Sequence, residues 1–160
     1  MMLTGDEVQL VTFRVGGQEF GLDIQQVERI LRHAQPVPVP NAPAFLEGVL
    51  AYDGGAIPVV DLRKRLAVAA PVSDETRIVV VGLAGERVGV VVDDVREVIR
   101  TDAGRIAAPP AMVRGLAAEF VTGIATVDEA RVVILLNTRR LFSSTERIAL
   151  ERAVQGAGRG

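Results

Sequence analysis

Residues 45–66 read FLEGVLAYDGGAIPVVDLRKRL, and this stretch guides the interpretation of the whole chain. Two apolar runs, one ending at Leu50 and one starting at Ala56, flank the sequence Asp53-Gly54-Gly55. Glycine supplies the positive φ angles that tight hairpin turns need, so the pattern predicts a β-hairpin. Pro58 has no N–H group, which predicts that the second strand lies at a sheet edge or is bulged there.

The same pattern occurs a second time in residues 120–141, where FVTGIA precedes a turn at Asp128-Glu129 and VVILLNTRRL follows it. In this alignment Gly48 matches Gly123 and Asp61 matches Asn137, and we expect Asp61 and Asn137 to cap the turns that follow them. Upstream, residues 21–32 match residues 89–100 without a gap. The matched order indicates an internal duplication. We therefore expect two similar halves, about 10–66 and 76–142, which are each marginal in size and should share a core.

The remaining segments have simpler patterns. Residues 8–15 and 20–22, with a Gly16-Gly17 turn between them, predict a further hairpin, and residues 77–83 and 88–92 predict two more strands. One helical turn is expected at 24–28 and another at Asp93-Asp94. The proline-rich residues 35–43 predict an extended crossover. A capping-box spacing that begins at Ser143 predicts a C-terminal helix, 144–154, followed by a disordered tail, 156–160.

The composition excludes several classes of protein. The chain has 160 residues, of which 49% are hydrophobic and 24% charged, and its formal net charge is −2. A globular balance without a basic run argues against a nucleic-acid or membrane-surface binder. The absence of cysteine excludes disulfide and thiol chemistry, and the single histidine argues against a zinc site. No apolar run has the length of a membrane span and no signal peptide is recognisable, so we expect a soluble cytoplasmic protein.

Catalytic patterns are weak. An aspartic protease needs Asp-Thr/Ser-Gly in each half so that two carboxylates can share one proton, whereas this chain has Asp53-Gly54-Gly55 and Asp128-Glu129-Ala130. The glycine-rich residues 82–89 lack the Lys-Ser/Thr of a phosphate-binding loop and predict a β-turn. His33 has no serine or cysteine partner and is interpreted as a solvated loop residue. We therefore expect no catalytic, cofactor or metal site.

The duplicated pattern resembles the CheW-like family of chemotaxis coupling proteins over about residues 10–142. The first half carries the resemblance in Val15-Gly16-Gly17, residues 20–24, Val27, Pro40, Ala42-Pro43, Gly48-Val49, Gly54 and residues 57–63. The second half carries it in residues 88–93, Val95, Val98, Gly123-Ile124 and residues 133–136. The string Ile-Pro-Val-Val-Asp-Leu-Arg downstream of Gly-Val is specific to that family.

This resemblance implies a mainly β fold, with two pseudo-repeated five-stranded SH3-like barrels that share a core, short helices and a C-terminal helix. It implies a non-enzymatic adaptor without a cofactor. Such an adaptor couples the cytoplasmic tip of a methyl-accepting chemoreceptor to the regulatory domain of a CheA-type histidine kinase in bacterial two-component signalling. The kinase domain has the same fold and is contacted barrel to barrel. Binding to nucleic acid and insertion into a membrane are not implied, and the isolated protein should be a monomer or self-associate weakly.

The candidate partner-binding residues are Val27, Arg29, Gly48, Val49, Asp53 and Gly54. We expect Val27, Gly48 and Val49 near the groove in which a receptor helix tip docks, the alternative being that Val27 is ordinary core. Members of the family usually carry Glu at the position of Arg29 and Arg at the position of Asp53. This double reversal predicts an Arg29–Asp53 ion pair of inverted polarity, with a role in the choice of partner.

Two other functions stay open at this point. One is a divergent CheW-like paralogue that binds a single partner in a pathway other than chemotaxis. The other, from a different class, is a hydrolase built on a doubled barrel.

Overall fold

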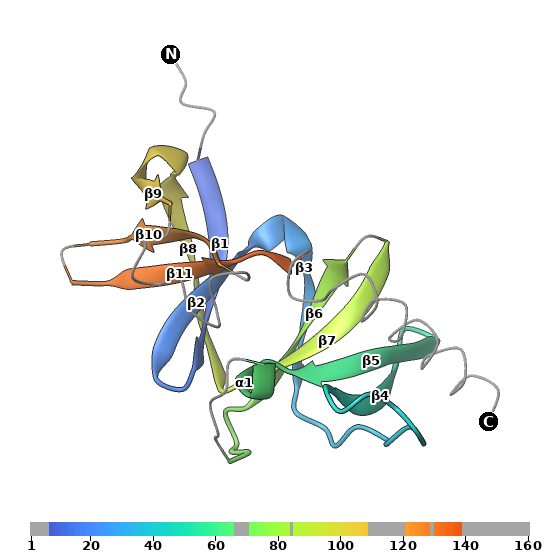
Figure 1. Ribbon diagram of the computed structural model, residues 1–160. Helices are drawn as coiled ribbons and strands as arrows, with labels where there is room; N and C mark the ends of the chain where they lie inside the picture. Colours follow the sequence, from blue (N-terminus) through green and yellow to red (C-terminus); the bar gives the residue numbers. More distant parts are fainter. Residues whose placement is uncertain (1–6, 66–70, 84, 109–120, 129, 139–160) are drawn as a thin grey trace.

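The described part of the chain folds into two β-sheets with very little helix (Figure 1). The structure is a computed structural model that describes residues 7–65, 71–83, 85–108, 121–128 and 130–138. The expected C-terminal helix, 144–154, and the expected tail, 156–160, lie outside the described residues.

The six-stranded sheet has the order β8-β1-β2-β11-β10-β9. Its strands are β1 (Glu7–Val15), β2 (Gln18–Asp23), β8 (Asp94–Asp102), β9 (Ile106–Ala107), β10 (Val121–Thr126) and β11 (Val132–Leu136). The five-stranded sheet has the order β3-β6-β7-β5-β4. Its strands are β3 (Val27–Arg32), β4 (Leu46–Tyr52), β5 (Gly55–Asp61), β6 (Arg77–Leu83) and β7 (Glu86–Val92). The helical pieces are η2 (Ile24–Gln26), η3 (Ala103–Arg105) and α1 (Leu62–Arg65).

The two sheets repeat one strand order, but each combines strands from both halves of the duplicated sequence. The β1–β2 hairpin of the first half pairs with β8 and β11, and the β6–β7 hairpin of the second half pairs with β3 and β5. In Figure 1 the β1–β2 hairpin accordingly lies beside β10 and β11, and the β6–β7 hairpin lies beside β4 and β5. The registers also match, because Leu135 lies opposite Gly21 and the equivalent Val59 lies opposite Gly89. The halves have exchanged their hairpins.

Five strands were expected in each half, and the six-stranded sheet has one more. The additional strand, β9, pairs through Ala107 with Ile124. Its counterpart in the first half is an isolated bridge between Val37 and Val49, within the proline-rich crossover. Both segments therefore make the same contact, but only β9 is long enough to form a strand.

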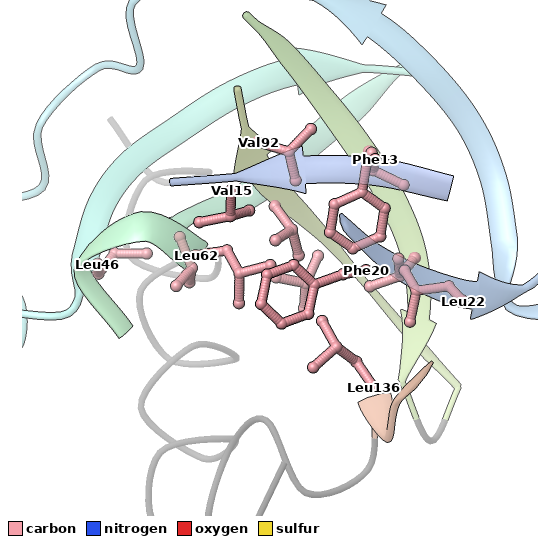
Figure 2. Close-up of a cluster of buried hydrophobic side chains, with 13 residues drawn as sticks. Phe13, Val15, Phe20, Leu22, Leu46, Leu62, Val92 and Leu136 are labelled. Carbon is pink, nitrogen blue, oxygen red and sulfur yellow. The ribbon is translucent and has the colours of Figure 1, made fainter. Parts of the chain in front are cut away.

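The main core lies between the sheets and draws on both of them. Phe13, Val15, Phe20, Leu22 and Leu136 come from the six-stranded sheet, and they pack against Leu46, Val60, Val79, Val81, Val88, Val90 and Val92 of the five-stranded sheet. Figure 2 shows these side chains gathered with Leu62 of α1. The Phe13 and Phe20 rings are stacked with their centroids 6.2 Å apart. The expectation of a shared core is confirmed, since burial of this apolar surface joins the two sheets.

The hairpin predicted at 45–66 is confirmed, with Tyr52 opposite Gly55 and positive φ angles at Asp53 (50°) and Gly54 (80°). The edge position expected for Pro58 is wrong, because β5 is an interior strand between β7 and β4. The β4–β5 ladder is nevertheless irregular one residue away, where its register shifts between Leu46 and Gly48. The sheet tolerates Pro58 for two reasons. Val49, which faces Pro58, exchanges its own N–H and C=O hydrogen bonds with Val37 instead, both at 2.9 Å. On the other side, the ladder with β7 begins one residue later, at Val59.

The two expected helical turns have different outcomes. The turn at 24–28 is present as the short helix η2, Ile24–Gln26, and Asp23 caps it by accepting the Gln25 N–H at 2.9 Å. The turn expected at Asp93-Asp94 is wrong, because Asp94 begins strand β8. The Asp93 carboxylate accepts the Gly16 N–H at 2.7 Å, and the Asp93 N–H donates to the Arg14 carbonyl. These bonds to the β1–β2 hairpin hold the chain extended as it passes between the sheets.

Candidate partner-binding surface

The six candidate residues lie on the two outer strands of the five-stranded sheet or in the turn that follows one of them. Val27 and Arg29 belong to β3, Gly48 and Val49 to β4, and Asp53 and Gly54 to the turn that follows β4. A hydrogen bond of 2.5 Å from the Tyr52 hydroxyl to Glu28 Oε2 joins these outer strands. The sheet is therefore curved enough to bring its two edges together, and residues distant in the strand order share one surface.

Five charged and aromatic side chains form what we call the Tyr52 cluster: Glu28, Arg29, Tyr52, Asp53 and Arg87. The Arg29 and Arg87 guanidinium carbons each lie 5.8 Å from the centre of the Tyr52 ring, a distance typical of cation–π contacts. The hydrogen bond to Glu28 raises the pKa of Tyr52, because the phenolate would stand beside a carboxylate. The cluster is exposed, with 67% of the Asp53 side chain accessible.

The structure does not contain the expected ion pair between Arg29 and Asp53. Asp53 Oδ2 pairs instead with Arg87 Nη1 at 3.1 Å, and Arg87 Nε pairs with Glu28 Oε1, also at 3.1 Å. Arg87 is on β7, and only the exchange of hairpins between the halves places it beside the turn that holds Asp53. Among the described residues, no carboxylate lies within ion-pair distance of Arg29. Within the cluster, Arg87 therefore pairs with two carboxylates, whereas Arg29 contacts the ring of Tyr52 and no carboxylate of the cluster.

Gly48 and Val49 lie beneath Val37, away from solvent. Gly48 is buried with φ 151°, and a Cβ at this position would stand 2.4 Å from the Val37 carbonyl oxygen. Val49 is 7% exposed, whereas Val37 above it is 64% exposed. Any contact between these two residues and a partner therefore passes through Val37. Gly54 is exposed, with no neighbouring atom near its missing Cβ.

Val27 is half-buried and packs against the main core, so it belongs in part to the core and in part to the surface. The neighbouring Ile30 is 42% exposed on the same strand. In the repeat alignment Ile30 matches Val98 on β8, which is 53% exposed. Sequence reasoning missed both residues, because an apolar residue within a strand is normally assigned to the core. The repeat alignment shows that the two positions match, but their exposure is visible only in the structure.

A second feature, which we call the inter-sheet clamp, consists of Asp61, Arg63 and Asp93. Asp61 accepts the Arg63 backbone N–H at 2.9 Å, so the predicted cap at Asp61 is confirmed. The Arg63 Nε and Nη2 atoms each donate to Asp61 at 2.9 Å, and Nη1 lies 3.5 Å from Asp93 Oδ1. These bonds raise the pKa of Arg63, the bond to Asp61 contributing most. With Asp93 also bound to Gly16, the clamp connects the end of β5 to the six-stranded sheet.

The six-stranded sheet carries a different charge arrangement at the place that matches the Tyr52 cluster. Arg131 forms two hydrogen bonds to Glu19, at 2.9 and 2.5 Å, and its Nη1 lies 3.5 Å from Glu97. The Arg131 guanidinium lowers the pKa of Glu19, chiefly through these hydrogen bonds. Because the β1–β2 and β6–β7 hairpins turn at equivalent residues, the repeat alignment extends upstream without a gap and matches Glu19 with Arg87. It also matches Glu97 with Arg29. Corresponding positions of the two sheets therefore carry opposite charges.

The carboxylates and the histidine considered for metal binding or catalysis have the following places in the structure. No group of three or more histidine, aspartate or glutamate side chains in this part of the chain could hold a metal ion. Asp53 pairs with Arg87, and Asp128 accepts the N–H groups of Ala130 and Arg131, so these two carboxylates do not share a proton. His33 lies in the segment after β3, outside any strand. Among the described helices, none is long and apolar enough to cross a membrane.

Comparisons with known proteins agree on one family. The model of the CheW-like domain matches residues 9–146. A chemotaxis protein CheW of Klebsiella aerogenes is 33% identical over 156 residues, which cover 96% of this chain and 93% of the relative. The CheW protein of Treponema pallidum is 29% identical over 151 residues, covering 91% and 88% of the two chains. The crystal structure of the scaffolding protein CheW of Thermoanaerobacter tengcongensis superposes with a TM-score of 0.79 at 32% identity, and covers 87% of this chain and 94% of that one.

Proposed function

The chain belongs to the CheW-like domain family, and on that basis we propose that it binds both the cytoplasmic tip of a chemoreceptor and the regulatory domain of a CheA-type histidine kinase. It is a chemotaxis coupling and scaffold protein of the CheW type, and the scaffold proteins of this family are not enzymes. Its place of action, by this proposal, is the cytoplasmic side of the membrane, where the receptor tip and the kinase meet.

The finer architecture supports contacts with a kinase domain of similar fold. We propose that each sheet closes into an SH3-like barrel and that a pseudo-two-fold axis relates the two. The shared strand order supports the relation, and the Tyr52–Glu28 bond between the outer strands β3 and β4 supports closure of the five-stranded sheet. A closed sheet leaves few free backbone groups at its edges, so a partner is recognised mainly through side chains.

The proposed partner site depends on one observation, which is that the two arginines of the Tyr52 cluster differ in their carboxylate partners. Arg87 already neutralises Asp53 and Glu28, while Arg29 has no carboxylate partner among the described residues. Arg29 is exposed and lies over an aromatic ring, so a partner carboxylate can reach it at a small cost in desolvation. Exposed charges mainly control which partner binds and how fast. Arg29, where relatives usually carry Glu, therefore selects a partner with an acidic side chain at this point.

We further propose that apolar residues of the two outer strands, next to the cluster, together form a strip that suits the receptor tip. Val27 and Ile30 lie on β3, and Val37 covers Gly48 and Val49 of β4. An amphipathic helix binds such a strip through apolar residues spaced three and four apart. Gly48 serves this surface by allowing Val37 to approach β4 closely.

The central experiment measures binding of the purified full chain to a CheA-type regulatory domain and, separately, to a receptor tip fragment. We expect dissociation constants no weaker than tens of micromolar, roughly the weak end for transient interfaces. Binding of neither partner at that concentration would contradict the adaptor function. Binding of one alone would favour the second candidate, a divergent paralogue with a single partner, which the residue types at Arg29 and Asp53 also favour.

The role of Arg29 is tested by Arg29→Glu and Asp53→Arg. Arg29→Glu should weaken partner binding about tenfold or more, because it sets two like charges against each other. Asp53→Arg should act mainly by disturbing Arg87, so Arg87→Gln serves as its matched control. If Arg29→Glu binds as the parent does, Arg29 has no part in recognition.

The receptor strip is tested by Ile30→Glu, with the exposed Val132→Glu on the other sheet as its control. Ile30→Glu should reduce binding of the receptor fragment while thermal unfolding stays cooperative. Val27→Glu is a less suitable variant, because Val27 packs on the core and its loss would unfold the protein. If Ile30→Glu and Val132→Glu bind the receptor fragment with equal affinity, the apolar strip is not the receptor-binding surface.

A further inference from the structure

An open pocket of about 500 Å³ lies where β3 ends and β6 begins. Two of its lining residues, Arg32 and Arg77, stand directly opposite each other in the β3–β6 ladder. Like charges in opposite positions of an antiparallel pair destabilise it. Neither arginine has a carboxylate of a described residue within 4.0 Å. The pocket is therefore lined by two arginines whose charge the described residues leave unmatched.

Backbone groups fix one of these arginines in place. Arg77 Nη1 donates to the carbonyl oxygens of Asp74 at 2.7 Å and Thr76 at 3.0 Å. The turn that carries these carbonyls is itself closed, because the Ser73 N–H donates to Thr76 Oγ1 at 2.9 Å. The Nε and Nη2 groups of Arg77 make no hydrogen bond with the described residues, so they remain available on a side chain that is already ordered. An ordered donor loses less entropy when a ligand binds.

The duplication provides an internal comparison for this pocket. In the repeat alignment Arg32 matches Arg100 and Arg77 matches Gln9, and these two residues also lie opposite each other in the β1–β8 ladder. In that ladder Gln9, at the position of Arg77, is uncharged, and Arg100 Nε lies 4.0 Å from Glu7 Oε1. A pocket of about 220 Å³ beside Arg100 is lined by Glu7, Thr101, Asp102, Arg105 and Val127, and not by Gln9. The pair of unmatched arginines is thus specific to the five-stranded sheet.

We propose that this pocket binds a small phosphate ester, with the phosphate group held between Arg32 and Arg77. Guanidinium groups donate two parallel hydrogen bonds to phosphate oxygens, a geometry that a single lysine cannot offer. The carboxylate of Asp74 also lines the pocket, so two arginines and one aspartate leave a net positive charge. The volume falls in the range of small-ligand sites and exceeds what a phosphate ion needs. Val72, which is 55% exposed, supplies an apolar wall for the carbon part of the ester.

His33 makes the proposal straightforward to test, because it lines the pocket and is the only histidine of the chain. Its ring protons give one separate set of NMR signals from the full-length protein. We would titrate glycerol phosphate, inorganic phosphate and sodium chloride at constant pH and matched ionic strength. The signals should move to saturation with glycerol phosphate, at a lower concentration than with inorganic phosphate, and should move little with chloride.

Two matched variants locate the site. Arg32→Gln should weaken glycerol phosphate binding about tenfold or more, since a charge-assisted hydrogen bond is lost. Arg100→Gln, at the equivalent position of the other sheet, should leave binding unchanged. Should Arg32→Gln unfold the protein, Arg77→Lys keeps the charge, removes the fork of donors and should also weaken binding.

Three results would overturn the proposal. A shift of the His33 signals that grows linearly and equally with chloride would show that there is no site. Equal weakening by Arg100→Gln would place the effect elsewhere, and equal affinity for inorganic phosphate would exclude an ester as the ligand. None of these measurements involves the kinase or the receptor, so their outcome is independent of the adaptor function.

Discussion

Replacing Arg63 with methionine would leave the Asp61 carboxylate buried without its ion-pair partner. Asp61 is 6% and Arg63 is 5% exposed, and three hydrogen bonds join them. Methionine retains much of the apolar stem but removes the two guanidinium donors at 2.9 Å, together with the weaker contacts to Pro71 and Asp93 at 3.3 and 3.5 Å. The variant therefore isolates the charge at the centre of the inter-sheet clamp.

Breaking a buried ion pair by removing one partner typically costs about 3–5 kcal/mol. Asp61 would keep the backbone N–H of residue 63, and Asp93 would keep its bond to Gly16, so we expect the lower end, about 3 kcal/mol. In urea, with a slope of about 2 kcal/mol per molar for a chain of this size, the unfolding midpoint should fall by roughly 1.5 M.

The assay is urea unfolding followed by circular dichroism, with a double variant and a surface control. Asp61→Leu combined with Arg63→Met replaces both charges by apolar groups and should recover most of the loss, to within about 1 kcal/mol of the parent. Lys64→Met, on the same helical turn, breaks only the exposed Lys64–Glu47 pair and should cost less than about 1 kcal/mol. Two results would contradict this reasoning: Arg63→Met loses no more stability than Lys64→Met, or the double variant is as unstable as Arg63→Met. In either case the buried ion pair is not the source of the clamp's stability.

Two further predictions concern stability. Gly48→Ala should lower the free energy of unfolding by about 2 kcal/mol or more, because its Cβ would stand 2.4 Å from a backbone oxygen at a φ of 151°. Gly82→Ala is the control, because its Cβ would have no atom within 4 Å, and it should melt within a few degrees of the parent in calorimetry. The pKa of Glu19 is lowered in the folded state, so its pairing with Arg131 stabilises the fold above the unfolded-state pKa and is lost as the pH falls through the folded one. Between about pH 5 and pH 3 the parent should therefore lose more stability in urea unfolding than Glu19→Gln does, and parallel losses would contradict the pairing.

Local signals explain what the sequence predicted correctly. The Asp53-Gly54 turn, the alternation of 46–52 and 56–60 and the cap at Asp61 each depend on residues close in sequence. The exchange of hairpins was not predictable in this way, because each hairpin presents an apolar face that suits either sheet. Gly21 lies beside β11 and the matched Gly89 lies beside β5, and no residue close to either glycine in the sequence indicates which strand it will meet.

The same limit explains the error at the candidate site. Asp53 and Arg87 lie on different halves of the sequence, and they become neighbours only because β7 joins the five-stranded sheet. The opposite charges of Arg29 and Asp53 can be read from the sequence, but charge alone did not identify the partner of each. The buried position of Val49 was equally hidden, since it depends on Val37 folding over β4.

The exchanged hairpins have a consequence for how such a chain could arise. One repeat unit alone, equivalent to residues 10–66, would have a hairpin that fits another unit's sheet and a sheet that lacks its central strands. A single-unit ancestor would therefore have folded as a homodimer with reciprocally swapped hairpins. Fusion of its two copies into one gene would have made that symmetric dimer a single polypeptide. Afterwards the two ends could diverge, and positions that were identical by symmetry could acquire opposite charges, as Glu19 and Arg87 now have.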